Sequence, residues 1–225
     1  MSVADCIFKN QDDENVFLIG SNYWPSSSAI NMWTEWNPEE LIKDVKRMKA
    51  LGMNCCRPFL FMPDFLTNED RVDPVMLERL QYFLSICEEN ELYTLPTFIV
   101  GHMSGEDWGM PWLKGSDLLK DRRVVDAIKF YITTVIKAIN NFKYIQAWLL
   151  SNELPNFVGK QEPDDVTKWV EEIIATIRAI DSQRPISIGD GAWAPEIIAD
   201  QTGFHLRKLN LYQDFVGLHF YPRGM

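Results

Sequence analysis

Asn152 and Glu153 place an amide beside a carboxylic acid, directly after the run 144–151, which reads as a buried strand. The end of such a strand brings both side chains to solvent. Enzymes built from parallel strands keep their catalytic groups at strand ends of this kind. A carboxyl group there can donate a proton, but most enzymes that cleave glycosidic bonds need a second carboxylate facing the first. No obvious second carboxylate stands out in this chain.

Polar and aromatic residues recur at the ends of the other predicted strands. Parallel strands bring these ends to one mouth, and turn chemistry alone would not supply so many Arg, His and Glu side chains. We therefore predict that they form one site. In chain order the set is Asn22, Tyr23 and Trp24; Arg57; His102; Asn152 and Glu153; Asp190; and His219 and Tyr221.

The elements that position this set alternate between short β-rich runs and amphipathic helices. Signals at Asn37-Pro38 and Asp73-Pro74 predict the starts of two helices, and Gly52 predicts the end of the first. Glu40 stands where a capping box places its acid. Apolar stripes predict two further helices, over 125–139 and 166–180. Strands are predicted over 16–22, 53–58, 92–100, 144–150, 185–189 and 215–221.

This alternation, with no linker of low complexity, predicts a single α/β domain over residues 1–225 with parallel strands. A doubly wound sheet accommodates six strands, but no glycine-rich phosphate loop follows the first strand. A (β/α)8 TIM barrel uses eight units and about 250 residues. We therefore predict a TIM-barrel type of fold with about six β/α units present, incomplete at its C-terminal end.

Composition limits the partners. The net charge is -10 and the basic residues are scattered, which argues against nucleic acid. No apolar run approaches the roughly 20 residues of a membrane span, and no signal peptide is seen, so a cytoplasmic location is expected. Cys6, Cys55, Cys56 and Cys87 lack metal-site spacing and are expected to be free core thiols. No metal and no cofactor are expected.

The strand-end motifs, taken in order, resemble the retaining clan A glycoside hydrolases. Within that clan they are most similar to family 5 and the endo-β-mannanase-type and cellulase-type proteins. Each motif is a weak signal alone, but together, in this order, the motifs are a strong one. The resemblance extends over nearly the whole chain. The motifs are Gly-Ser-Asn-Tyr-Trp at 20–24, Asn-Cys-Cys-Arg at 54–57, Gly-His-Met-Ser-Gly at 101–105, Trp148 through Asn152-Glu153, and His-Phe-Tyr-Pro at 219–222.

The resemblance implies a role for each matching residue. Glu153 matches the general acid/base, and Asn152 the amide that binds the sugar 2-hydroxyl. His219 and Tyr221 match a His-x-Tyr pair that supports the two carboxylates. Arg57 matches an Arg held beneath the nucleophile. The candidate substrate-binding residues are His102, Asn22, Trp24, Trp108 and Asp190.

The nucleophile of this family is a Glu at the end of a seventh strand, and a subsite Trp follows an eighth. The sequence provides neither strand. Asp190 is the best carboxylate to stand in, although turn formation in Gly-Asp-Gly explains it more simply. Simpler readings remain for the others: Glu153 as a loop acid, Asn152 as a turn former, His102 as a loop histidine, His219 as a buried structural histidine, and Arg57 as a surface arginine. Further aromatic residues that could stack on sugars are Trp33, Trp36, Trp112 and Trp193, although core or loop packing is the simpler role for any one Trp.

The sequence therefore predicts a glycoside hydrolase acting on β-linked mannose or glucose chains, with its nucleophile beyond the end of this chain. Two alternatives remain: a carbohydrate-binding relic without activity, and one half of a split enzyme. Unpaired sheet edges also predict self-association or a complementing chain.

Overall fold

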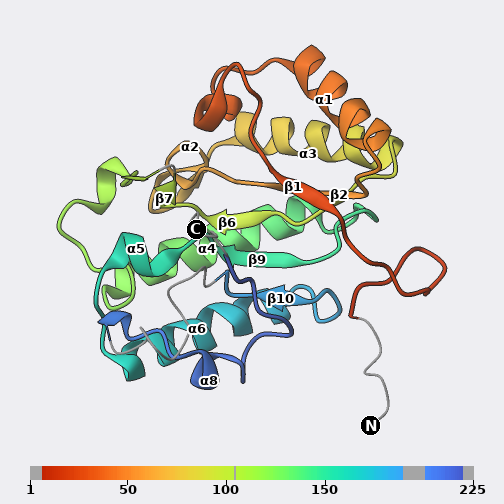
Figure 1. Cartoon of the computed structure of the whole chain (residues 1–225). Helices are drawn as coiled ribbons and strands as arrows, with labels where there is room; N and C mark the ends of the chain where they lie inside the picture. Colours follow the sequence, from red (N-terminus) through yellow and green to blue (C-terminus); the bar gives the residue numbers. More distant parts are fainter. Residues whose placement is uncertain (1–6, 104, 190–200, 220–225) are drawn as a thin grey trace, which may run out of the picture.

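Parallel strands at the centre of the molecule follow one another in sequence order (Figure 1). The computed structural model describes residues 7–103, 105–189 and 201–219. Two three-stranded parallel sheets, β1-β2-β5 and β10-β9-β6, are joined by bridges from Phe59 to Thr97 and from Thr94 to Ile145. The strands are β1 (Gly20–Tyr23), β2 (Cys55–Pro58), β5 (Tyr93–Thr94), β6 (Thr97–Ile99), β9 (Trp148–Ser151) and β10 (Ile186–Ser187).

The third predicted strand, 92–100, is divided into β5 and β6 at Leu95-Pro96. Leu95 donates its N–H to Cys56 O at 3.0 Å, on the β2 side. Pro96 has no N–H, and its carbonyl accepts from Leu149 N at 3.0 Å, on the β9 side. The prediction of one unbroken strand is therefore wrong, because proline interrupts the ladder where the chain changes its bonding neighbour.

The sixth predicted strand, 215–221, is not formed by its described residues, 215–219. Among the described residues, the edge of β10 away from β9 is bound partly by side chains: Ile186 N donates to Asp214 Oδ2 at 2.7 Å, and Ile188 N donates to Gln213 Oε1 at 2.9 Å. One backbone bond also joins the two segments, from Asp214 N to Ile186 O at 2.8 Å. The two side-chain contacts occupy donors that a neighbouring strand would use. Residues 220 and 221 lie outside the described residues.

Four long helices alternate with the strands and pack in sequence order around them: α1 (Pro38–Ala50), α3 (Pro74–Glu89), α4 (Arg122–Ile139) and α6 (Pro163–Arg178) (Figure 1). The predicted starts are confirmed. Asn37 Oδ1 accepts from Glu40 N at 3.3 Å, and Asp73 Oδ1 accepts from Val75 N at 2.8 Å. Glu40 closes no capping box, because its carboxylate accepts from Ser27 N at 3.2 Å.

Shorter elements connect these units. Two antiparallel hairpins, β3 (Leu66–Asn68) with β4 (Arg71–Val72) and β7 (His102–Met103) with β8 (Glu106–Asp107), follow β2 and β6. The short helices are η1 (Ala29–Trp33), α2 (Met62–Phe65), η2 (Pro111–Leu113), α5 (Leu154–Val158) and α8 (Leu206–Leu209). No helix among the described residues is long and apolar enough to span a membrane.

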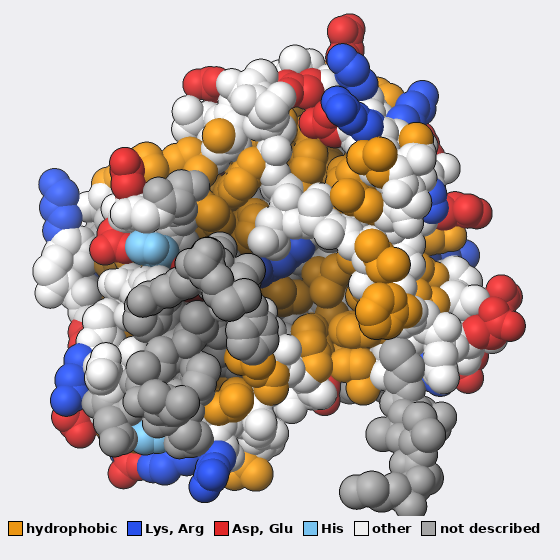
Figure 2. All heavy atoms as spheres, in the orientation of Figure 1, with side chains coloured by type: hydrophobic (Ala, Val, Ile, Leu, Met, Phe, Trp, Pro, Cys, Tyr) orange, Lys and Arg blue, Asp and Glu red, His pale blue; other side chains and the backbone are white. Residues whose placement is uncertain are grey.

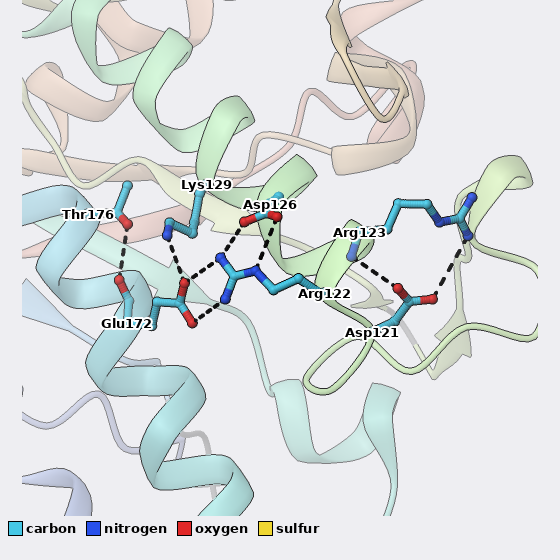
Figure 3. A network of polar contacts seen from close by, with 7 residues as sticks. All are labelled: Asp121, Arg122, Arg123, Asp126, Lys129, Glu172 and Thr176. Carbon is cyan, nitrogen blue, oxygen red and sulfur yellow. Dashed lines mark hydrogen bonds and ion pairs between the residues drawn. The ribbon is translucent and has the colours of Figure 1, made fainter.

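An ion-pair network joins α4 to α6 on the surface (Figure 3). Arg122 donates to Glu172 at 2.7 and 2.9 Å and to Asp126 at 3.1 Å, and Lys129 donates to Glu172 at 2.7 Å. The hydrogen bonds from Arg122 and Lys129 hold the pKa of Glu172 down at about 2. The network therefore fixes two neighbouring helices to each other through charge.

The core lies between the sheet and the helices and is built from large side chains such as Trp33, Trp148, Tyr131 and Phe98, all fully buried. Cys55, Cys56 and Cys87 are free and buried, as expected, while Cys6 lies outside the described residues. Trp33 is fully buried and its Nε1 donates to Phe59 O at 2.7 Å, so of its two possible roles it has core packing and not sugar stacking.

The α/β class and the sequential parallel order predicted from the sequence are confirmed, and the described residues do not close a barrel. Before β1, Phe17 and Ile19 are 82% and 56% exposed. Asn54 holds this segment through Ile19 N to Oδ1 at 2.7 Å and Nδ2 to Phe17 O at 2.8 Å. Figure 2 shows hydrophobic side chains gathered around a hollow in the face drawn there, over the strands of the sheet.

Candidate active site

Glu153 occupies a strained turn between β9 and α5. Its backbone is left-handed, with φ 48° and ψ 44°, a region that costs a residue with a Cβ about 1–2 kcal/mol. Two hydrogen bonds hold it there: Glu153 N donates to Gly189 O at 3.2 Å, and Asn156 N donates to Glu153 O at 2.9 Å. Strain of this kind persists only where the surroundings enforce it, and it clusters at functional sites.

The carboxylate of Glu153 faces His219, which lies 66 residues further along the chain. His219 Nδ1 is 2.7 Å from Glu153 Oε1, and both side chains are largely buried, at 15% and 13% exposure. On its other side, His219 Nε2 lies 3.2 Å from Arg57 Nη1. Because a guanidinium only donates, Nε2 must accept, and the ring proton is therefore assigned to Nδ1, facing the carboxylate. A neutral His219 satisfies both neighbours at once.

Arg57 ties three strands together beneath this pair. Its Nε donates to Thr97 Oγ1 at 2.9 Å, and its Nη2 donates to Ser151 O at 3.3 Å. Its guanidinium also lies 4.8 Å from the centre of the Phe59 ring. These partners fix the half-buried guanidinium of Arg57 in position, so its positive charge stays close to the strand ends.

The pKa of Glu153 is held below its ordinary value. The hydrogen bond from His219 is the main cause, and the neighbouring His102 and Arg57 add to it, while burial opposes the shift. The described site therefore favours an ionised Glu153. A general acid must hold its proton near neutral pH, and a second carboxylate nearby is what would raise this pKa.

Asn152 and His102 complete one side of the site. Asn152 is buried, and its Nδ2 donates to His102 O at 3.0 Å. His102 Nδ1 lies 2.7 Å from Asp107 Oδ1, across the β7–β8 hairpin. Beside them, Asn156 Nδ2 donates to Glu153 Oε2 at 3.2 Å, so each carboxylate oxygen of Glu153 has a partner.

Three predicted sugar-contacting residues lie at the ends of neighbouring elements. Asn22 is exposed and stands opposite Arg57 in the β1–β2 register. Trp24 is half-buried and stacks on Phe59 with ring centres 5.2 Å apart. Trp108 packs edge-on against Phe61 at 5.8 Å, and its Nε1 donates to Met103 O at 3.2 Å. Asp190, Tyr221 and Trp193, also named from the sequence, lie outside the described residues.

The structure brings Arg57, Glu153 and His219 into direct contact, and Asn152 with His102 beside them. Sequence reasoning missed the residues that hold this set. Asn156 follows Glu153 at the three-residue spacing of a helical turn, which could have identified it. Nothing local in the sequence marks Thr97, Ser151 and Gly189, while Asp107 lies in the segment 105–109, which sequence predicts to line the cleft. Among the described residues, no group of three or more His, Cys, Asp or Glu side chains could hold a metal ion.

A parallel sheet in sequence order, flanked by alternating helices and carrying Arg, His, Asn and Glu at its strand ends, is the arrangement that the sequence predicted for an incomplete TIM-barrel glycosidase. The sequence model of the cellulase family, glycosyl hydrolase family 5, matches residues 10–223. This match covers almost all of the chain. The chain therefore belongs to glycosyl hydrolase family 5.

Individual relatives act on mannose-containing chains. A probable mannan endo-1,4-β-mannosidase A of Aspergillus niger is 26% identical over 161 residues, which is 65% of this chain and 41% of that protein. An exo-β-1,4-mannosidase from Opitutaceae bacterium strain TAV5 is 27% identical with a TM-score of 0.82, over 92% of this chain and 37% of that one.

An endo-1,4-β-mannanase from Rhizomucor miehei shares the fold, with a TM-score of 0.74 at 17% identity, over 95% of this chain and 69% of that one. The chain thus spans less than half of the first two relatives.

Proposed function

We propose that this chain carries the acid/base half of a retaining glycosidase site for β-linked mannose or glucose chains. The observation that carries the proposal is the contact between Glu153 and His219 at 2.7 Å, beside Asn152 at the end of β9. The family match and the similarity to mannosidases support the substrate class.

In the proposed reaction, Glu153 gives its proton to the glycosidic oxygen as a second carboxylate attacks the anomeric carbon. A covalent glycosyl-enzyme forms, and the aglycone leaves with that proton. Glu153, now ionised, takes a proton from water as the water attacks the same carbon and releases the nucleophile. Asn152 would bind the sugar 2-hydroxyl and Arg57 would hold the nucleophile ionised, and Tyr221 would donate a hydrogen bond to it.

The second carboxylate is proposed to come from residues beyond this chain, either in a longer protein of which residues 1–225 form an incomplete domain or in a complementing chain. The chain spans less than half of the first two relatives, and this supports the proposal. A nucleophilic carboxylate about 5 Å away would raise the pKa of Glu153 and let it carry the proton that the first step needs. For the chain alone, binding without cleavage is therefore the better-supported behaviour.

The test compares two forms of the protein on substrates whose leaving groups differ. The 225-residue chain is expected to hydrolyse neither aryl β-mannosides nor β-mannan above background. A form extended by a strand that ends in Glu is expected to turn both over. In that form Glu153→Gln should slow β-mannan hydrolysis by about 10²–10⁴-fold. Formation of the glycosyl-enzyme from a dinitrophenyl mannoside should slow far less, because that leaving group needs no proton.

Other outcomes separate the rivals. Turnover by the 225-residue chain that Glu153→Gln abolishes would show that the nucleophile lies within it. Binding of manno-oligosaccharides with no turnover by any extended form would favour a carbohydrate-binding relic. Equal loss on good and poor leaving groups would assign Glu153 a role other than proton donation.

A further inference from the structure

A histidine–aspartate pair on the β7–β8 hairpin lies beside the candidate site, and the proposed cleavage chemistry gives Asp107 no role. His102 Nδ1 lies 2.7 Å from Asp107 Oδ1. A carboxylate oxygen can only accept a hydrogen bond, so the ring proton of His102 is assigned to Nδ1. The imidazole is 20% exposed and the carboxylate 58%, so the pair lies at the surface of the site, within reach of a ligand.

The backbone of this hairpin is fixed against the candidate site. Asn152 donates from Nδ2 to His102 O at 3.0 Å. Trp108 follows the hairpin and holds its base, because its N donates to Gly101 O at 2.6 Å. The orientation of the His102 ring is therefore the freedom that remains, and among the described residues Asp107 is the hydrogen-bond partner that holds this ring.

The second ring nitrogen of His102 has no hydrogen-bond partner among the described residues and is not one of their buried unpartnered atoms. It is therefore open to a ligand. With the proton on Nδ1, Nε2 carries a lone pair and accepts a hydrogen bond. An imidazole without a carboxylate partner can rotate or hold its proton on Nε2, and in that form Nε2 donates instead. Asp107 thus decides whether the open nitrogen accepts or donates.

His219 provides the contrast. Its Nδ1 also faces a carboxylate oxygen at 2.7 Å, in Glu153, but its Nε2 is occupied by Arg57 at 3.2 Å. Both nitrogens of that ring are therefore used within the protein. Of the two histidines in the candidate site, His102 is the one whose ring has a nitrogen left for a ligand.

We propose that Asp107 is a positioning residue of this site: it holds the proton of His102 on Nδ1, so that Nε2 accepts a hydrogen bond from a hydroxyl group of the bound β-linked saccharide. The proposal deepens the proposed function and rests on it for the class of ligand. Its consequence is selectivity. A sugar that presents a hydroxyl proton to Nε2 gains a hydrogen bond, whereas an ether oxygen at the same point meets a lone pair and binds more weakly.

The first measurement reads the ring of His102 in the 225-residue chain, above neutral pH and without ligand. Nitrogen-15 NMR distinguishes a protonated ring nitrogen from an unprotonated one. Asp107→Ala should move the proton to Nε2, the nitrogen that a free imidazole prefers to protonate. Asp107→Asn should keep it on Nδ1, because the amide oxygen can still accept. Glu106→Ala is the matched control, since Glu106 is exposed on the same strand but pairs with Met103.

The second measurement is calorimetry of the same proteins with β-1,4-mannotriose and with cellotriose. For the trisaccharide that the unmodified chain binds more tightly, Asp107→Ala should weaken binding about fivefold, the worth of one hydrogen bond. Asp107→Asn and Glu106→Ala should bind as the unmodified chain does. Because the Asp107 side chain is 58% exposed, its replacement should leave the fold intact, and melting temperatures check this.

The outcomes separate this proposal from the proposed function. A proton that stays on Nδ1 in Asp107→Ala, or protons on both ring nitrogens of His102 in the unmodified chain, would overturn the role of Asp107. Equal affinities of Asp107→Ala and the unmodified chain would also overturn it. Each of these results leaves the proposed function standing. Absence of trisaccharide binding by the unmodified chain would overturn the proposal together with the ligand class of the proposed function.

Discussion

His219 Nδ1 donates to Glu153 Oε1 across 2.7 Å, between two segments separated by 66 residues of sequence. The partner on the other ring nitrogen is Arg57, which can only donate, so the histidine is left neutral with its proton toward the carboxylate. The ring of His219 therefore contacts both the guanidinium of Arg57, which is fixed in position, and the carboxylate of Glu153, which lies at a strained turn. Glu153 is held ionised by the same contacts that hold it still.

Removal of this ring should release the carboxylate. We expect His219→Ala to raise the pKa of Glu153, because the hydrogen bond from His219 is the largest of the influences that lower it. A carboxyl group with a lowered folded pKa stabilises the fold above its unfolded pKa, and that contribution is lost as pH falls through the folded value. NMR titration of the Glu153 side-chain carbon measures the pKa, with His205→Ala as control. An unchanged titration would contradict the assigned hydrogen bond.

Gly189 should tolerate no side chain. Its φ is 75°, and an added Cβ would lie 1.9 Å from Ser151 O, beside the turn that holds Glu153. Gly189→Ala should therefore lower the free energy of unfolding by about 2–4 kcal/mol, from backbone strain and overpacking together.

Gly52→Ala is its control, since Gly52 has φ 82° but nothing within 4 Å of an added Cβ. This control should lose only the backbone part, about 1–2 kcal/mol. Chemical denaturation of both variants measures the difference, and equal losses would show that the approach to Ser151 is not tight.

The ion pairs between α4 and α6 predict a stability that depends on pH (Figure 3). Glu172 is about one-third exposed, so Glu172→Gln should cost about 0.5–1 kcal/mol at pH 7. The folded pKa is about 2, below the ordinary value of 4.5, so this contribution is present above pH 4.5 and disappears between pH 4.5 and 2.

Thermal unfolding across that range checks the prediction, with Glu171→Gln on the same helix as control. A difference between the unmodified chain and Glu172→Gln that persisted unchanged at pH 2 would rule out the network as its source.

The segment before β1 predicts self-association. Phe17 and Ile19 are exposed beside an edge strand, and apolar edges of parallel sheets favour pairing with other chains. Phe17→Lys should shift the chain toward monomer in sedimentation velocity at a given concentration. Leu211→Lys, at a residue 80% exposed after α8, should have no such effect. A monomeric unmodified chain over the same concentrations would remove the basis for this expectation.

Local features of the fold were predictable from sequence because the signals and their causes lie a few residues apart. Asn37 and Asp73 cap their helices by reaching two or three residues forward. The order of the strands in the sheet could also be predicted, because each helix returns the chain to the next parallel strand. The interruption of the predicted strand at Pro96 was missed, because it depends on which neighbouring strand each backbone carbonyl faces.

The features of the candidate site also divide into those that sequence could identify and those that depend on distant contacts. Glu153 and Asn152 stand next to each other at a strand end and could be identified directly. The neutral state of His219 could not, because it depends on Arg57, which lies 162 residues earlier in the sequence. Sequence left Trp33 open between core packing and sugar stacking, because burial of an indole is decided by the elements packed over it and not by its sequence neighbours.

The side chains of Asp214 and Gln213 bind backbone N–H groups along β10. The edge of the sheet at β10 therefore differs from the edge at β1 in how readily another strand can pair with it. A strand arriving at β10 would first have to displace a carboxylate and an amide that already satisfy two backbone donors. Beside β1, the exposed Phe17 and Ile19 offer apolar contact to an arriving strand. We therefore expect any strand added to this sheet to pair readily beside β1 and only slowly beside β10.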